Sequence, residues 1–197
     1  MNGFGGNGTG NLTQSAGTRI RYLIQPNRNG RARVTKCVYT AGATAHPLTF
    51  ARPLGRTTAS AAAAAGQAVI NLTSDPGPSG NGIAANDLLA IRETDGVTRL
   101  YTVQSVSALA ITLTSNLVAG AAAGAKVWNF GLVTDVNPAD GVAHPSISGI
   151  AGQTTTYEDR EGGLFATFVT DDPILFDSGN ATNAGTLQQL NWSFTVD

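Results

Sequence analysis

The stretch TTASAAAAAGQAVINL, residues 57–72, combines two opposed local signals. Its five consecutive alanines, residues 61–65, are of the residue type with the highest helix propensity. The residues that follow, Ala68 to Leu72, have the composition and length of a short strand. Gly66 stands between the two and ends any helix there. The stretch therefore predicts at most one helical turn, followed by a β-strand.

A second alanine segment repeats this pattern. AAAGQAVINL at 63–72 aligns without gaps with AAAGAKVWNF at 121–130, sharing AAAG, a valine, an asparagine and an apolar last residue. Alanine and glycine let main chains approach closely, so we expect both segments at the ends of a small β-barrel over 57–130. Ala63 and Ala122 are then expected in tight sites. Chance similarity in a chain rich in alanine and glycine is the alternative.

The rest of the chain reads as short strands separated by turn residues. Asp95-Gly96 is a tight-turn pair, and Leu190, Trp192, Phe194 and Val196 alternate with polar residues in the last strand. The sequence predicts an all-β fold, with the barrel module inserted in or adjoining a sandwich-like domain of 18–56 plus 131–197. Residues 1–17 carry six glycines. They predict a flexible, extended N-terminal arm.

The composition limits the classes of function. Charged residues make up 13% of the chain, against roughly 25% in an average domain. No apolar run approaches the ~20 residues of a membrane span, so a membrane partner is not expected. The single cysteine, Cys37, excludes a disulfide framework within the chain, and its strand-like surroundings predict a buried structural thiol.

Charge is distributed unevenly. Residues 1–74 carry eight basic and no acidic residues, whereas 75–197 carry all thirteen acids and four bases. This asymmetry indicates a polar interaction surface, unless the two parts neutralise each other within one fold. Like charges across a hairpin need partners, and the candidates are Glu158, Asp159, Glu161, Asp171 and Asp172. The candidate partner-binding residues are two arm anchors and the basic hairpin: Phe4, Leu12, Arg19, Arg21, Arg28, Arg31, Arg33 and Lys36.

Neither histidine nor carboxylate clusters form a convincing catalytic or metal motif. His46 and His144 both precede proline, which favours extended chain at a strand start, although a shared metal is the alternative if the fold brings them together. Asp135–Gly141 lacks the ligand spacing of a calcium loop. Glu158–Glu161 sits at a Gly-Gly turn, where charged tips are ordinary. We expect no enzymatic activity, no cofactor and no metal.

The stretch 57–130 resembles a module of virion proteins from tailed bacteriophages. The likeness rests on the alanine-rich opening that ends in glycine, on NDLLAI at 86–91, on VQSVS through ITLTSNL at 103–117, and on AGAKV at 123–127. Asn86 departs from the module's usual glycine, and Gly120 from a frequent His-like residue. The resemblance covers about a third of the chain, and the flanks share only a general character with phage head proteins.

The resemblance implies a non-enzymatic structural protein of a bacteriophage virion. The first expectation is a decoration or cement protein, located on the capsid surface, that binds the capsid's outer face and stabilises it. Its expected partners are the major capsid protein or other virion proteins, and further copies of itself in a symmetric homo-oligomer. The alternative is a tail or fibre component that binds a host surface glycan. A nucleic-acid-binding module is a weaker alternative, because the basic hairpin offers only Tyr22 and Tyr39 for stacking.

Overall fold

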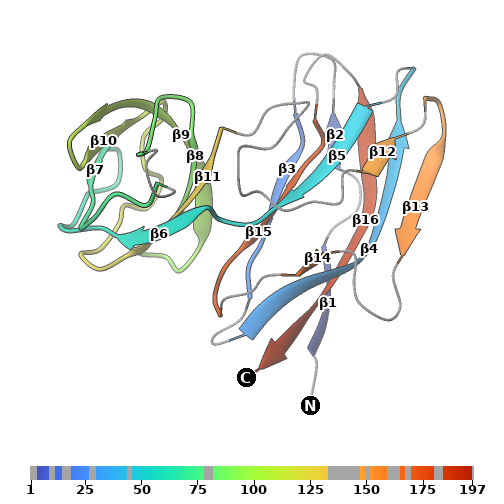
Figure 1. The fold of residues 1–197 in the computed structure, drawn as a ribbon, viewed down its shortest axis with the longest axis horizontal. Coiled ribbons are helices and arrows are strands. Elements are labelled where there is room, and N and C mark those ends of the chain that lie inside the picture. The colour runs from blue at the N-terminus through green and yellow to red at the C-terminus, as the bar shows by residue number, and fades with distance from the viewer. Residues whose placement is uncertain are drawn as a thin grey trace. The chain divides into compact units, whose positions relative to one another are not determined.

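The computed structural model describes residues 4–8, 12–14, 19–26, 30–43, 46–77, 82–132, 147–149, 151–158, 165–166, 170–179 and 184–196. Every regular element in these residues is a strand, which confirms the predicted all-β class (Figure 1). None of these residues forms a helix that could span a membrane. The chain divides into two compact units, one built from its first and last parts and the other running from Pro53 through the described residues up to 132.

The first unit contains two antiparallel sheets. The larger has the order β1-β16-β4-β13, with β2 also pairing with β16 and β14 with β4. Its strands are β1 (Phe4–Gly8), β2 (Leu12–Gln14), β4 (Gly30–Ala41), β13 (Thr154–Glu158), β14 (Phe165–Ala166) and β16 (Gly185–Val196). The smaller sheet has the order β12-β5-β15-β3. Its strands are β3 (Arg21–Ile24), β5 (His46–Ala51), β12 (Ile147–Gly149) and β15 (Ile174–Asp177).

One hydrophobic core joins these two sheets into a sandwich. Val34 and Tyr39 of β4 belong to the same buried cluster as Phe50 of β5 and Phe176 of β15. Phe50 and Phe176 are register partners, and their ring centroids lie 5.5 Å apart in a tilted arrangement. Cys37 of β4 is also fully buried in this core, as its strand-like surroundings indicated. The sandwich thus gathers residues from both ends of the sequence.

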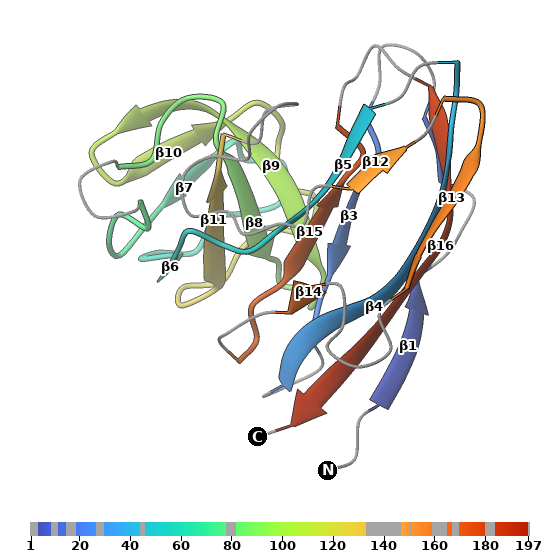
Figure 2. The ribbon, with the colours of Figure 1, turned by 45° about the vertical axis from the view of Figure 1, so that its right-hand side comes forward.

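The N-terminal arm forms edge strands in this structure. β1 pairs with β16 from Phe4–Phe194 to Gly8–Leu190, and β2 continues along the same side of β16 from Leu12–Leu187 (Figures 1 and 2). The described parts of 1–17 are thus extended, as expected, and the flexibility of the arm in the free protein stays a prediction. Main-chain hydrogen bonds to a long neighbouring strand order such a segment without requiring a core of its own.

The second unit is a single curled sheet of six strands with the order β6-β11-β8-β9-β10-β7 (Figure 2). Its strands are β6 (Gly55–Thr58), β7 (Val69–Asn71), β8 (Leu88–Arg92), β9 (Thr98–Ser107), β10 (Ala110–Leu113) and β11 (Lys126–Gly131). A bridge between Ala59 and Leu72 joins the ends of the two outermost strands, so the sheet curls into a small barrel. The unit begins slightly before the expected residue 57, because β6 pairs with β11.

Inward-facing aliphatic side chains fill this barrel. Ile70, Leu89, Ile91, Ile111 and Leu113 are fully buried in one cluster, to which Ala59, Ala63 and Ala121 also belong. On β10, Ile111 and Leu113 are buried while Ala110 and Thr112 are only half-buried. Leu109, which shares the sequence alternation of Ile111 and Leu113, precedes the strand and is exposed. Tyr101 is the largest member of this cluster, and the other members are small or medium-sized, which suits a narrow barrel.

Candidate functional site

The two alanine segments meet each other in the barrel unit. Ala63 and Ala121 form an antiparallel bridge in which each N–H donates to the other's carbonyl at 2.8 Å. These two residues open the two AAAG sequences, so equivalent positions of the repeat lie face to face. The sequence repeat therefore corresponds to a structural repeat, in which the two copies pair with each other. We call the paired segments 59–67 and 117–125 the alanine ladder.

The hydrogen bonds of the alanine ladder are related by a local two-fold symmetry. Each main-chain bond has a counterpart in which donor and acceptor are exchanged between the two segments. The outer pairs are Ala59 N–H to Ala125 C=O (2.9 Å) with Leu117 N–H to Gln67 C=O (2.8 Å), and Gly66 N–H to Leu117 C=O with Gly124 N–H to Ala59 C=O (2.8 Å each). Gly66 and Gly124 share a positive φ, of 83° and 79°, which glycine adopts without steric cost.

Only some of the alanines occupy tight sites. Ala63 and Ala121 are buried, as is Ala59, whereas Ala122 is exposed. The expectation of a tight site is thus met at Ala63 and wrong at Ala122, because the repeat places Ala121, not Ala122, opposite Ala63. The main chain is close here as well: a Cβ on Gly120 would lie 2.6 Å from the Ala63 carbonyl oxygen. Small residues are needed where the two segments cross.

A shallow hollow lies between the first alanine segment and β7. Its volume is about 340 Å³. The lining residues are Ala62, Ala63, Gln67, Ala68, Val69 and Asn71. None of these residues carries a charge, and two polar side chains, Gln67 and Asn71, stand among methyl groups. We call this the edge hollow. It is a candidate for binding by shape and main-chain contacts, because it contains no group that performs acid–base or nucleophilic chemistry.

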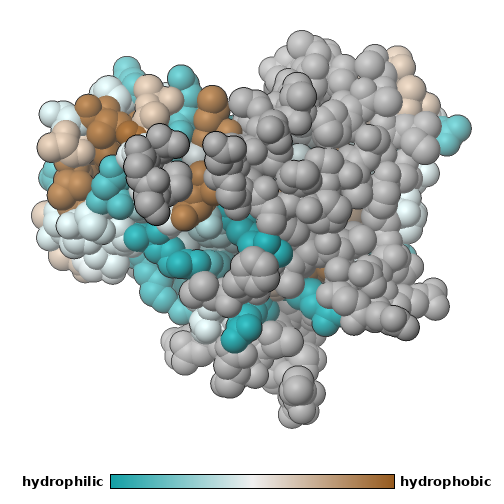
Figure 3. Space-filling view, viewed as in Figure 1, coloured by the Kyte–Doolittle hydropathy of each residue, from teal (hydrophilic) through white to brown (hydrophobic). Residues whose placement is uncertain are grey.

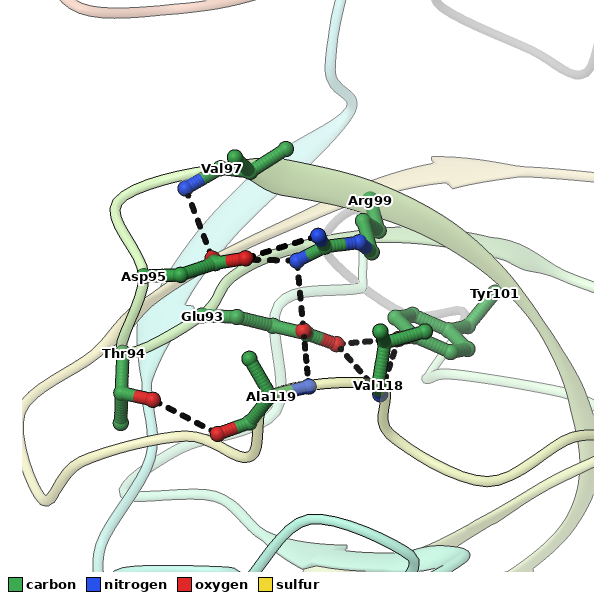
Figure 4. Close-up of polar contacts among 8 residues, drawn as sticks. All are labelled: Glu93, Thr94, Asp95, Val97, Arg99, Tyr101, Val118 and Ala119. Carbon is green, nitrogen blue, oxygen red and sulfur yellow. Dashed lines mark hydrogen bonds and ion pairs between the residues drawn. The ribbon is translucent and has the colours of Figure 1, made fainter.

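A buried carboxylate, Glu93, ties the β8–β9 hairpin to the second alanine segment (Figure 4). Its Oε1 accepts hydrogen bonds from the Tyr101 hydroxyl and from Val118 N–H. Its Oε2 accepts from Ala119 N–H and from Arg99 Nη1, both at 2.7 Å. Four donors occupy the roughly four lone-pair positions of a carboxylate. Glu93 is therefore arranged as a structural acceptor.

Arg99 links this buried carboxylate to an exposed one. Its Nη2 lies 2.7 Å from Asp95 Oδ2, and that hydrogen bond, with support from Val97 N–H, holds the pKa of Asp95 below its usual value. Burial, followed by the hydrogen bond to Glu93, raises the pKa of Tyr101 to about 12. Both shifts favour an ionised Asp95 and a protonated Tyr101 at neutral pH. The cluster therefore keeps one arrangement of charges and hydrogen bonds in the barrel.

Part of the basic hairpin is neutralised within the sandwich unit. Arg19 Nε and Arg21 Nε donate to the two oxygens of Asp177, at 3.1 and 2.8 Å. Asp177 is fully buried and also accepts from Gly179 N–H. This acid was not among the expected partners, because the β3–β15 pairing that sets Arg21 opposite Asp177 joins distant parts of the sequence. The sequence feature that points to this acid is a hydrophobic run that ends in it, ILFD at 174–177.

The other candidate residues are more scattered. Arg31 on β4 is exposed, whereas Arg33 and Lys36 are half-buried and Lys36 pairs in register with Glu158 of β13. Arg28 lies outside the described residues. Phe4 and Leu12 lie on β1 and β2, one in each edge strand. The structure thus brings Arg19 and Arg21 together and spreads the described remainder along β1, β2 and β4.

The two histidines do not define a site in the described residues. His46 lies on β5, in register with Gly149, and His144 is outside the described part of the chain, as are Asp135–Gly141. Among the described residues, no group of three or more His, Cys, Asp or Glu side chains is placed to hold a metal ion. Burial raises the pKa of the Cys37 thiol to about 12, which makes it a poor nucleophile.

None of the protein-family models, curated proteins or solved structures compared with this chain matches it. Its candidate sites are therefore weighed on their own geometry. The edge hollow and the apolar surface around it are the features suited to binding. Among the residues whose burial is described, the exposed large apolar ones are all in the barrel unit: Val69, Val97, Val106, Leu109, Val118 and Leu132. Brown, apolar atoms gather in the region of β7 and β10 (Figure 3).

Proposed function

We propose that this chain is a non-enzymatic structural protein of a bacteriophage virion, and that it decorates and stabilises the capsid's outer surface. The supporting observation is that the segments carrying the resemblance are the ones that build the barrel. The alanine segments pair as the alanine ladder, NDLLAI enters β8, and the VQSVS–ITLTS stretch forms β9 and β10. A motif that coincides with the structural joints of a module is more informative than one scattered over its surface.

The position of Asn86 also supports this proposal. Asn86 stands where the module usually has glycine, and its φ is 74°. Glycine adopts such a conformation freely, and asparagine tolerates it best among the other residues. The departure from the motif therefore preserves the backbone that the motif requires.

Three buried acids, Asp87, Glu93 and Asp177, act as structural acceptors, which suits a rigid binding protein. Glu93 joins a hairpin to the alanine ladder, and Asp177 joins β15 to Arg19 and Arg21. Asp87 accepts from Ala84 N–H at 3.0 Å and so shapes the turn before β8. Each of these groups holds strands or turns in place.

The alternatives differ in what they require of the surface. A nucleic-acid-binding module needs a cationic surface, and the pairing of Arg19 and Arg21 with Asp177 makes that surface smaller than the sequence suggests. The second candidate function is that of a tail or fibre protein that binds a host glycan, which the same kind of fold could serve. The proposed partner is the major capsid protein, and the proposed assembly is a symmetric homo-oligomer.

Imaging of purified virions, with and without this gene product, tests the proposal. We expect a regular outer layer to be lost from the capsid when the protein is absent, and to return when purified protein is added back. Capsids lacking the layer should also burst at lower temperature. Loss of density from the tail instead would favour the glycan-binding alternative, and unchanged virions would contradict both.

A further inference from the structure

We draw no further inference here: the strongest candidate, the edge hollow beside β7 with the apolar surface around it, lies within the single loop 60–71, and nothing in the structure shows what covers it.

Discussion

Ala63 and Ala121, which occupy the same place in two copies of AAAG, exchange both of their main-chain hydrogen bonds at 2.8 Å. Neither position has room for a longer side chain, because both are buried where two backbones cross. The alanines thus serve close approach of strands, although alanine as a residue favours helix. Tertiary pairing overrides local propensity because the flanking glycines adopt φ values that a helix cannot continue.

Substitution of either crossing alanine should destabilise the barrel. We expect Ala63→Leu and Ala121→Leu to lower the free energy of unfolding by about 1–3 kcal/mol through overpacking. Ala64→Leu and Ala122→Leu, at exposed positions in the same two segments, should change it little. Urea denaturation of the four variants measures this difference. Equal stability of all four would mean that the alanine ladder is not the close-packed joint described here.

Two substitutions of Asn86 test whether the positive φ at this turn affects the stability of the barrel. Asn86→Gly should be neutral or stabilising, whereas Asn86→Ala should cost about 1–2 kcal/mol, because alanine lacks the local hydrogen bonding that makes this conformation tolerable. Thermal unfolding of the two variants beside the parent provides the measurement. A more stable alanine variant would contradict the left-handed conformation.

The sequence predicted the two alanine segments and the all-β class, because these depend on local pattern. The alternation expected over Leu190–Val196 stays a prediction, because the side chains from 191 on lie outside those described. The sequence did not predict that Ala121, and not Ala122, faces Ala63, since that choice depends on the register between segments far apart in the chain. Likewise, Asp177 was not identified as the acid beside Arg19 and Arg21, because strand pairing across the whole sequence brings them together.

The candidate site was harder to predict than the fold. The edge hollow lies between segments whose register is set by pairing across the barrel, and side-chain patterns do not encode this register directly. The roles expected for Phe4 and Leu12 as assembly anchors stay predictions. Their strands pair with β16. A glycine-rich sequence carries no side-chain pattern that would predict this pairing. Hydrophobic periodicity does not detect a strand that is held mainly by main-chain hydrogen bonds.

Glu93 should matter more to stability than its exposed neighbour. Glu93→Gln places an amide donor against groups that are themselves donors, so we expect a loss on the order of 3 kcal/mol in the free energy of unfolding. Asp95→Asn removes the exposed partner of the same Arg99 and serves as the control, with little expected change. Similar stability for both variants would show that the buried hydrogen bonds are not limiting.

Alkaline pH should destabilise the barrel through Tyr101. The pKa of Tyr101 is raised from 10 to about 12, first by burial and then by its hydrogen bond to Glu93. The unfolded chain therefore releases this proton before the folded chain does. The contribution to stability is complete below pH 10 and is lost as the pH rises toward 12. Burial likewise raises the pKa of Tyr39 to about 12, so its contribution falls in the same window.

Denaturant unfolding at a series of pH values separates the two tyrosines. The parent should lose stability with rising pH more steeply than Tyr101→Phe, because the variant has one fewer group whose titration favours the unfolded state. Tyr39→Phe, in the sandwich unit, gives the corresponding comparison there. Identical slopes for parent and Tyr101→Phe would contradict the buried, hydrogen-bonded environment of Tyr101.

Salt dependence of capsid attachment tests what the basic hairpin contributes to the proposed function. Arg19 and Arg21 already share the buried Asp177, whereas Arg31 is exposed. An exposed ion pair adds only ~0–1 kcal/mol, so apolar contacts should dominate affinity while charges guide orientation and association. We therefore expect binding to emptied capsids to weaken moderately between ~0.05 and ~1 M salt and to persist at the upper end. Complete release at moderate salt would indicate a mainly electrostatic contact, such as nucleic acid. No response at all would mean that the hairpin's charges are satisfied within the fold and do not form the docking surface.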